Sequence, residues 1–301
     1  MKTNTYKKRI AIVLGIVLQI VQVTGCSQLL NTKLVMKYES ELELPTNQST
    51  KNYELTYNDY ETTYLDAFEI NFENIDTANT DYYSFENNTL TIFTAGNYIL
   101  NGNMTDGNIV VDVYDDEIVH FFLNNVQIAS RNAPAIYVDS ANKVILTALE
   151  GTENHLSDNA RHAQETNACV FSNVDLTING HGKLNVFGYH EDGIRTKDQL
   201  KVVNATVSVK SKGDGLRGND GIILQDSNVE IESEKNALYS DSTKDIIALQ
   251  GGTCKIVAGE NAIHATTKVV IKNITINLYS ILEAIECNGI QEIEEGCIND
   301  Q

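Results

Sequence analysis

Asp192-Gly193-Ile194-Arg195 recurs at near-constant spacing through the second half of the chain. Its later copies are Asp214-Gly215-Leu216-Arg217, Asn236-Ala237-Leu238-Tyr239, Asn261-Ala262-Ile263-His264 and a degenerate Glu283-Ala284-Ile285-Glu286. Successive copies follow after 22, 22, 25 and 22 residues, so one step carries a three-residue insertion. A repeat of about this length is typical of supersecondary units stacked into a solenoid.

Other apolar residues recur at fixed offsets within each repeat. Six residues after the apolar residue of the tetrapeptide comes a second such position, occupied by Leu200, Ile222 and Val269. A third is occupied by Val207, Val229, Cys254 and Ile276. Short alternating runs separated by Asn, Asp and Gly predict half-buried strands. Because three short strands make no sheet alone, we expect each strand to pair with its copy one coil later, in an all-β parallel β-helix with coils of about 22 residues.

Two other solenoids fit the period less well. An all-helical solenoid needs a sustained 3.6-residue apolar stripe, whereas these repeats are rich in Val, Ile, Thr, Asn and Gly. A leucine-rich repeat needs a denser leucine pattern than this chain has. Upstream, residues 135–138 and 168–171 resemble earlier turns of the same coil.

The N-terminus has the pattern of an export signal. Lys7-Lys8-Arg9 precedes an apolar stretch from Ile10 to Val21, which is short for a membrane span. The stretch closes on Val23-Thr24-Gly25-Cys26, which resembles a bacterial lipobox. We therefore expect a signal peptide at 1–25, a lipidated Cys26 with a polar tether over 26–50, and a single β-helical domain over 51–301. Such a chain is anchored by lipid on the extracytoplasmic face of a bacterial cell membrane. A signal peptide with an accidental cysteine is the alternative.

The charge balance restricts the partners. Residues 1–301 carry 22 Lys and Arg against 41 Asp and Glu, a formal net charge of −19. Nucleic acid is a poor partner for so acidic a chain, whereas bound cations suit it. Cys169 and Cys254 are predicted to be buried thiols, with Cys169 in the column of Ile194. Cys287 and Cys297 can form a disulfide in an exported protein.

Two successive repeats place a second aspartate six residues after the first. Asp192 is followed by Asp198, and Asp214 by Asp220. Since stacked coils lie about 4.8 Å apart, we expect these four carboxylates to gather along one edge and to hold calcium, a hard cation that takes oxygen ligands. The alternative is that Asp-Gly is turn chemistry, with the aspartate as a cap and the glycine at positive φ.

A second column runs beside these aspartates and consists of Arg195, Arg217, Tyr239 and His264. Strand alternation directs it outward if Ile194 and its equivalents point inward. Arginine offers a planar donor fork for carboxylates, and tyrosine offers a flat face for a sugar ring. The column predicts a binding site for an extended polysaccharide, particularly a uronic-acid polymer. The alternative is that these positions are solvated and accept any polar residue.

A series of motifs resembles a known family. It comprises 95–102, 106–112, 123–128, 135–138, 143–146, Glu150-Gly151-Thr152-Glu153-Asn154 and the Asp-Gly-Ile/Leu repeats. Together they resemble the carbohydrate-binding domain family of clostridial and other bacterial surface proteins. The resemblance implies a right-handed parallel β-helix shaped like pectate lyases, calcium ions, and binding of cellulose or acidic plant polysaccharides without cleavage. In the later repeats Asn236 and Asn261 replace aspartate and Thr267 replaces Asp198, which restricts the calcium expectation to the first two repeats.

We therefore expect a monomeric, membrane-anchored protein that binds polysaccharide and is not a nucleic-acid partner. A calcium-dependent polysaccharide lyase is the first alternative. Its base would have to be Arg195 or Arg217, which stay protonated, or Lys197 or Lys212 with a pKa lowered by burial. A structural or adhesive surface solenoid without a site is the second alternative.

Overall fold

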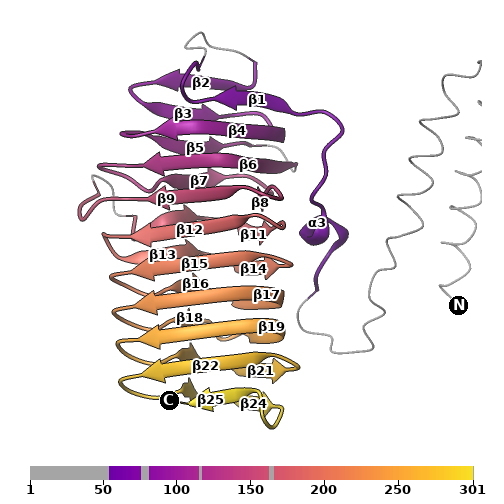
Figure 1. Cartoon of the computed structure of the whole chain (residues 1–301), viewed down its shortest axis with the longest axis vertical. Coiled ribbons are helices and arrows are strands. Elements are labelled where there is room, and N and C mark those ends of the chain that lie inside the picture. The colour runs from indigo at the N-terminus through magenta and orange to yellow at the C-terminus, as the bar shows by residue number, and fades with distance from the viewer. Residues whose placement is uncertain (1–53, 76–80, 115–116, 163–165, 301) are drawn as a thin grey trace, which may run out of the picture. The chain divides into compact units, whose positions relative to one another are not determined.

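The computed structural model describes residues 54–75, 81–114, 117–162 and 166–300. In these ranges the chain forms a single short helix, α3 (Tyr57–Tyr60), and is otherwise built of strands and turns. Figure 1 shows the strands stacked in chain order as a parallel β-solenoid, with about eight turns of roughly 24 residues. The predicted all-β parallel β-helix is confirmed. Over the described ranges, no helix is both long and apolar enough to cross a membrane.

One sheet, here called sheet 1, takes one strand from each coil. Its strands in the described ranges, in order of pairing, are β2 (Tyr83–Glu86), β3 (Thr89–Ile92), β5 (Asn108–Asp112), β7 (Ile136–Ser140), β10 (Ala168–Ser172), β13 (Asp192–Thr196), β16 (Leu216–Gly218), β18 (Leu238–Ser240), β20 (Ile263–Ala265) and β23 (Ile285–Cys287). β2 and β3 are antiparallel, and each later strand is parallel to its neighbour.

The other sheet, sheet 2, takes the rest of each coil. Its described strands are β1 (Phe68–Asn71), β4 (Gly96–Met104), β6 (Ile118–Ala129), β8 (Lys143–Ala148), β9 (Glu153–Ser157), β11 (Asp175–Asn179), β12 (Lys183–Gly188), β14 (Gln199–Val203), β15 (Thr206–Ser211), β17 (Gly221–Ser233), β19 (Ile247–Ala258), β21 (Lys268–Lys272), β22 (Thr275–Ser280), β24 (Ile290–Ile293) and β25 (Ile298–Asp300). In some coils one long strand replaces two short ones: the first half of β17 pairs with β14 and its second half with β15.

Parallel register stacks like residues into columns inside the coil. Ile194 pairs with Leu216, which pairs with Leu238, and all three are fully buried. In sheet 2, Val229 pairs with Cys254 as the repeats predict. Each buried aliphatic side chain contributes roughly 1.5–3 kcal/mol, so the columns together stabilise the stack of coils.

A strap formed by residues 54–61 packs on sheet 2 at β11 and β14. Its Asp59 is fully buried and accepts hydrogen bonds from Lys143 and from Thr177 Oγ1, the latter at 2.6 Å. Lys201 Nζ lies 3.4 Å from the other carboxylate oxygen. Burial alone would raise the pKa of Asp59, but the hydrogen bonds from Lys143 and Thr177 lower it to about 2. The strap therefore ties three neighbouring coils together.

One prediction about the cysteines needs correction, and one possibility that the sequence left open is not realised. Val170, not Cys169, pairs with Ile194; Cys169 stands one position earlier and is nevertheless fully buried. Strand β10 is buried along both faces, so apolar character alone does not tell which of its residues point inward. Cys287 and Cys297 are free thiols and form no disulfide in the described chain.

Candidate functional site

The four residues expected to form an outward column lie in one column of sheet 1. Arg195 pairs with Arg217, Arg217 with Tyr239, and Tyr239 with His264. Their neighbours Ile194, Leu216, Leu238 and Ile263 are fully buried, which directs the column outward. Upstream the column continues through Phe171 and Tyr137, and downstream through Glu286. We call the whole series the planar column, because nearly every member ends in a flat group.

Flat groups in the planar column stack on one another. The Arg217 guanidinium lies 4.3 Å from the centre of the Tyr239 ring. On the other side, the His264 ring lies 4.7 Å from that of Tyr239 at an interplanar angle of 13°. Because coil spacing matches the distance at which flat groups stack, both faces of Tyr239 are already occupied. The expectation that Tyr239 offers a face to a sugar ring is therefore wrong; only its edge and hydroxyl are accessible.

The repeated aspartates and asparagines form a hydrogen-bonded ladder between coils. Asp192 Oδ1 accepts the backbone N–H of Asp214 at 2.8 Å, and Asp214 Oδ1 accepts that of Asn236 at 3.1 Å. Asn236 Oδ1 accepts the N–H of Asn261 at 3.2 Å, and Asn261 Oδ1 accepts that of Glu283 at 3.0 Å. We call Asp192, Asp214, Asn236 and Asn261 the Asp/Asn ladder. Its hydrogen bonds satisfy backbone donors of the next coil, so the aspartates act as caps, as the turn alternative predicts. The other half of that alternative is wrong, because neither Gly193 nor Gly215 has a positive φ.

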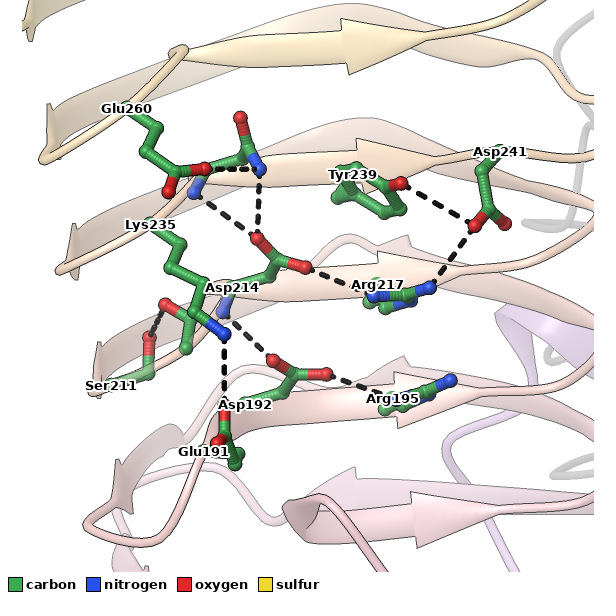
Figure 2. A network of polar contacts seen from close by, with 12 residues as sticks. Glu191, Asp192, Arg195, Ser211, Asp214, Arg217, Lys235, Tyr239, Asp241 and Glu260 are labelled. Carbon is green, nitrogen blue, oxygen red and sulfur yellow. Dashed lines mark hydrogen bonds and ion pairs between the residues drawn. The ribbon is translucent and has the colours of Figure 1, made fainter.

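The second oxygens of the two ladder aspartates face the arginines. Arg217 donates from Nη1 to Asp214 Oδ2 at 3.3 Å and from Nη2 to Asp241 Oδ2 at 3.1 Å (Figure 2). The corresponding Arg195 Nη1 is 3.6 Å from Asp192 Oδ2, beyond hydrogen-bonding distance. In the part of the chain that the structure describes, Asp192 Oδ2 and the Nε of both arginines are buried without a hydrogen-bond partner. Arg195 is thus held less tightly than Arg217.

Burial changes the protonation of this cluster. The pKa of Asp192 is raised to about 7, first by burial and then by the nearby Asp214 carboxylate. Burial and the neighbouring Arg217 lower the pKa of Arg195, which remains a cation at neutral pH. Near neutral pH a part of the Asp192 carboxyl groups is therefore protonated, and the protonated form does not neutralise Arg195.

A polar pocket of about 240 Å³ opens beside the ladder and the planar column. In addition to Asp192, Arg195, Asp214, Arg217, Asn236 and Tyr239, its walls include Asn167, Glu191, Lys235 and Glu260. Lys235 Nζ pairs with Glu191 at 3.0 Å, and Asn236 Nδ2 donates to Glu260 at 3.3 Å (Figure 2). The pocket thus presents both donors and acceptors, which suits a ligand rich in hydroxyl groups.

The four aspartates expected to share calcium do not gather at one edge. Asp192 begins strand β13 and Asp198 follows its end, so roughly 13 Å of extended strand separates them. Asp214 and Asp220 flank β16 in the same way. The six-residue spacing that suggested one cluster instead places the two pairs at opposite ends of the strands.

The residues present do not fit one cation shared by four carboxylates. At one end, guanidinium groups already lie against Asp192 and Asp214, where a cation would have to bind. At the other end, burial and the charges of Asp175 and Asp220 raise the pKa of Asp198. Within the described ranges, no group of three or more acidic, histidine or cysteine side chains is arranged to hold a metal ion.

The lysines considered as bases for a lyase lie in the open. Lys197 is exposed, with its Nζ 5.8 Å from the centre of the Phe171 ring. Lys212 is exposed and paired with Glu234. The burial that a lysine base requires is therefore missing at both positions.

Several residues of this site were not predicted from the repeats. Phe171 and Tyr137 could have been found by extending the column upstream, since 135–138 and 168–171 already resembled coils. Asp241 and Lys235 flank the tetrapeptide without recurring, so no periodic signal marks them.

Comparison with known proteins identifies the family. A family described as "carbohydrate-binding domain-containing protein" matches residues 86–295, and the chain belongs to it. A protein of that description from Acetivibrio thermocellus is 31% identical over 236 residues, which cover 75% of this chain and 82% of the relative. A solved structure, a polysaccharide lyase-like protein from C. thermocellum in a gadolinium derivative, superposes with a TM-score of 0.74 at 28% identity, covering 78% of this chain and 99% of that one. The family resemblance seen in the sequence is thereby confirmed.

Proposed function

We propose that this chain is a lipid-anchored, monomeric protein of the bacterial surface that binds acidic, pectin-like polysaccharide in the sheet 1 pocket without cleaving it. Family membership supports a carbohydrate ligand. The polar walls of the pocket, with Lys235, Asn167 and Glu260, provide partners for sugar hydroxyls.

The preference for an acidic glycan rests on the environment of Arg195. Its Nη1 is 3.6 Å from Asp192 Oδ2, beyond hydrogen-bonding distance. At neutral pH the carboxyl of Asp192 is partly protonated, which leaves the Arg195 charge available to a uronate carboxylate. Arg217 is held by two aspartates and acts mainly to position its neighbours.

Burial of the potential base favours binding over cleavage. Asp192 has a pKa suited to proton transfer near neutral pH, but its Oδ2 is buried. A substrate C–H bond has to come within hydrogen-bonding reach of a base, so a covered oxygen is a poor one. The lyase-like relative keeps cleavage as the alternative to be tested. Calcium support stays a prediction, now confined to Asp198 and Asp220.

Titration of the mature chain with polygalacturonate tests the proposal. Arg195→Gln should weaken binding about tenfold, the loss expected for one hydrogen bond to a charged group. Arg131→Gln is the control, because Arg131 is an exposed arginine that pairs with Asp106 outside the pocket. Binding should also weaken from pH 6 to pH 8, as Asp192 ionises and competes for Arg195.

Three outcomes would revise this assignment. If the parent and Arg195→Gln bind polygalacturonate with equal affinity, the binding site lies outside this pocket. Steady formation of an unsaturated product, followed by ultraviolet absorbance with calcium present, would make the protein a lyase. Absence of binding to any glycan would favour the structural or adhesive alternative.

Lipid anchoring has its own test, since Cys26 lies outside the described residues. Cys26→Ala should release the protein from membranes or leave its signal peptide uncleaved. Normal processing together with unchanged retention in the membrane fraction would refute the anchor.

A further inference from the structure

A second groove, of about 420 Å³, lies where strands of sheet 2 lead into the turns before sheet 1. It crosses the ends of β12, β15, β17, β19 and β22 and is lined by Gly188, Tyr189, Lys210, Ser211, Lys212, Glu232, Ser233, Glu234, Val257, Ala258, Gly259, Tyr279 and Ile281. None of these residues lines the sheet 1 pocket. Glu234 and Lys235 are chain neighbours that line the groove and the pocket respectively, so the two sites share one row of turns.

The groove runs along the stack of coils, because the residues that line it are in register from strand to strand. Its floor is a row of small, buried residues in register: Gly188, Ser211, Ser233 and Ala258. One wall is the row of outward residues immediately before them: Lys210, Glu232, Val257 and Tyr279. Residues just after the floor supply the other wall, including Tyr189 and Ile281. A row of small residues between two rows of larger ones makes a straight trough suited to an extended chain.

Aromatic rings stand exposed toward both ends of this trough. Tyr189 is 50% exposed and Tyr279 is 52% exposed, with Val257, at 42%, in the coil before Tyr279. The Tyr189 ring lies nearly parallel to that of Phe187, with the ring centres 6.3 Å apart, and about half of the residue stays exposed. This differs from Tyr239, which is covered on both sides. Four coil steps separate the two tyrosines, or roughly 19 Å at the spacing of parallel strands.

Charges in the groove cancel within it. Lys210 pairs with Glu232 at 2.7 Å, and Lys212 pairs with Glu234. With two cations and two anions the groove has no net charge, although the whole chain has a formal net charge of −19. Neither a polyanion nor a polycation gains from such a surface, whereas paired charged groups hydrogen-bond well to hydroxyls. Exposed rings add an apolar face of the kind that a sugar ring covers.

From these features we propose that the groove is a second polysaccharide site, which takes an extended, uncharged glycan stacked on Tyr189 and Tyr279. This inference rests on the proposed function in that the chain binds polysaccharide, but it uses a different surface and a different ligand. The chain would then hold an acidic and a neutral glycan at neighbouring sites.

Titration of the mature chain with cellohexaose and, separately, with polygalacturonate tests the groove. The double variant Tyr189→Ala/Tyr279→Ala should lose roughly tenfold or more in affinity for cellohexaose, as apolar contact with two rings is removed. Its affinity for polygalacturonate and its melting temperature should stay those of the parent, and cellohexaose binding should be insensitive to salt. Tyr114→Ala is the matched control, since Tyr114 is 86% exposed and lies outside the groove.

The possible failures are distinguishable. Unchanged cellohexaose binding in the double variant overturns the groove and leaves the sheet 1 pocket standing. If the parent chain binds polygalacturonate but not cellohexaose, the groove is likewise refuted and the sheet 1 pocket is retained. A parent that binds neither overturns the proposed function and the groove together. A parent that is a dimer, with the double variant monomeric, makes the groove an interface between copies and also overturns this proposal.

Discussion

The first two rungs of the Asp/Asn ladder differ from the last two in charge but not in their bond to the next coil. Asp192 and Asp214 accept a backbone N–H from that coil through Oδ1, and so do Asn236 and Asn261. The ladder therefore needs a side-chain carbonyl oxygen at each rung and not a negative charge. The negative charge of Asp192 and Asp214 must therefore have a role other than accepting the backbone hydrogen bond.

The planar column changes at the same point as the ladder. Rungs with aspartate have arginine three residues later, whereas the Asn236 and Asn261 rungs have Tyr239 and His264. One half of the site is thus a paired cluster of buried charges, and the other is a stack of rings. Buried charges stabilise a fold only when each retains its partner. The two halves should accordingly respond to substitution in opposite ways.

Removing a charged rung should have the largest effect. Asp214→Ala leaves the buried N–H of Asn236 without its acceptor and removes one partner of Arg217. We expect the free energy of unfolding, measured in urea, to fall by about 3 kcal/mol. Asp241→Ala is the control, because this exposed partner of Arg217 caps no backbone group, and it should cost under about 1 kcal/mol. Equal losses in the two variants would contradict a special role for the ladder.

Adding a charge to an uncharged rung should be the next largest effect. The Nδ2 of Asn236 donates to Asp214 Oδ1 and to Glu260 Oε2, so Asn236→Asp places a carboxylate against two others. At pH 8 we expect a loss of about 2 kcal/mol in stability. Most of the loss should be recovered at pH 4, where the new carboxyl can take up a proton. A variant as stable as the parent at pH 8 would show that charge at this rung is immaterial.

Removing the charge at the first rung should stabilise the protein. Because the folded pKa of Asp192 is about 7 against an ordinary 3.8, the folded state binds a proton between these values that the unfolded state lacks. The stability from this group is complete below about pH 4 and is lost as the pH rises toward 7. Asp192→Asn keeps a carbonyl oxygen for the ladder and carries no charge, so it should be more stable than the parent at pH 8, where the parent carboxyl is ionised against its raised pKa.

Comparison of urea unfolding at pH 5 and pH 8 checks this prediction. The advantage of Asp192→Asn over the parent should be larger at pH 8 than at pH 5. An advantage that does not vary with pH would mean that Asp192 does not titrate in this range.

Calcium should give the smallest effect and would act at the opposite end of the same strands. If Asp198 and Asp220 bind it, stability should rise by about 0.4 kcal/mol when free calcium equals the dissociation constant, and further with more calcium. The response should vanish in Asp198→Asn and persist in Asp192→Asn. If neither chelator nor calcium changes the melting temperature, the prediction of a calcium site is wrong.

The repeats predict much of this structure because a solenoid repeats its contacts. Residues at a fixed offset within each repeat, such as Ile194 and Leu200, occupy fixed places in every coil, so the columns follow from spacing. The all-β fold follows from spacing together with the Val-, Ile- and Thr-rich composition of the repeats. The same spacing misled the calcium expectation, since six residues of extended chain span a strand instead of returning to one point. Stacking of Tyr239 between Arg217 and His264 depends on the distance between coils, which no single repeat reveals.

Residues outside the period were beyond prediction for a related reason. Asp241, which fixes Arg217, and Asp59, which is remote in sequence from the coils it joins, have no counterpart one repeat away. The tyrosine groove needs the ends of five strands aligned at one corner, and its rings belong to coils four steps apart. Such features arise from tertiary packing and not from a local pattern.

The strap at 54–61 determines how the solenoid resists pulling from its N-terminal side. A chain end that continues from a terminal coil can be peeled away one hydrogen bond at a time. Here the chain leaves through the flank, where Asp59 holds β8, β11 and β14 through Lys143, Thr177 and Lys201. Tension transmitted through residue 54 therefore reaches three coils through the contacts of one side chain. If Cys26 is anchored in a membrane while the coils grip a polymer, Asp59 is the point at which that mechanical load enters the domain.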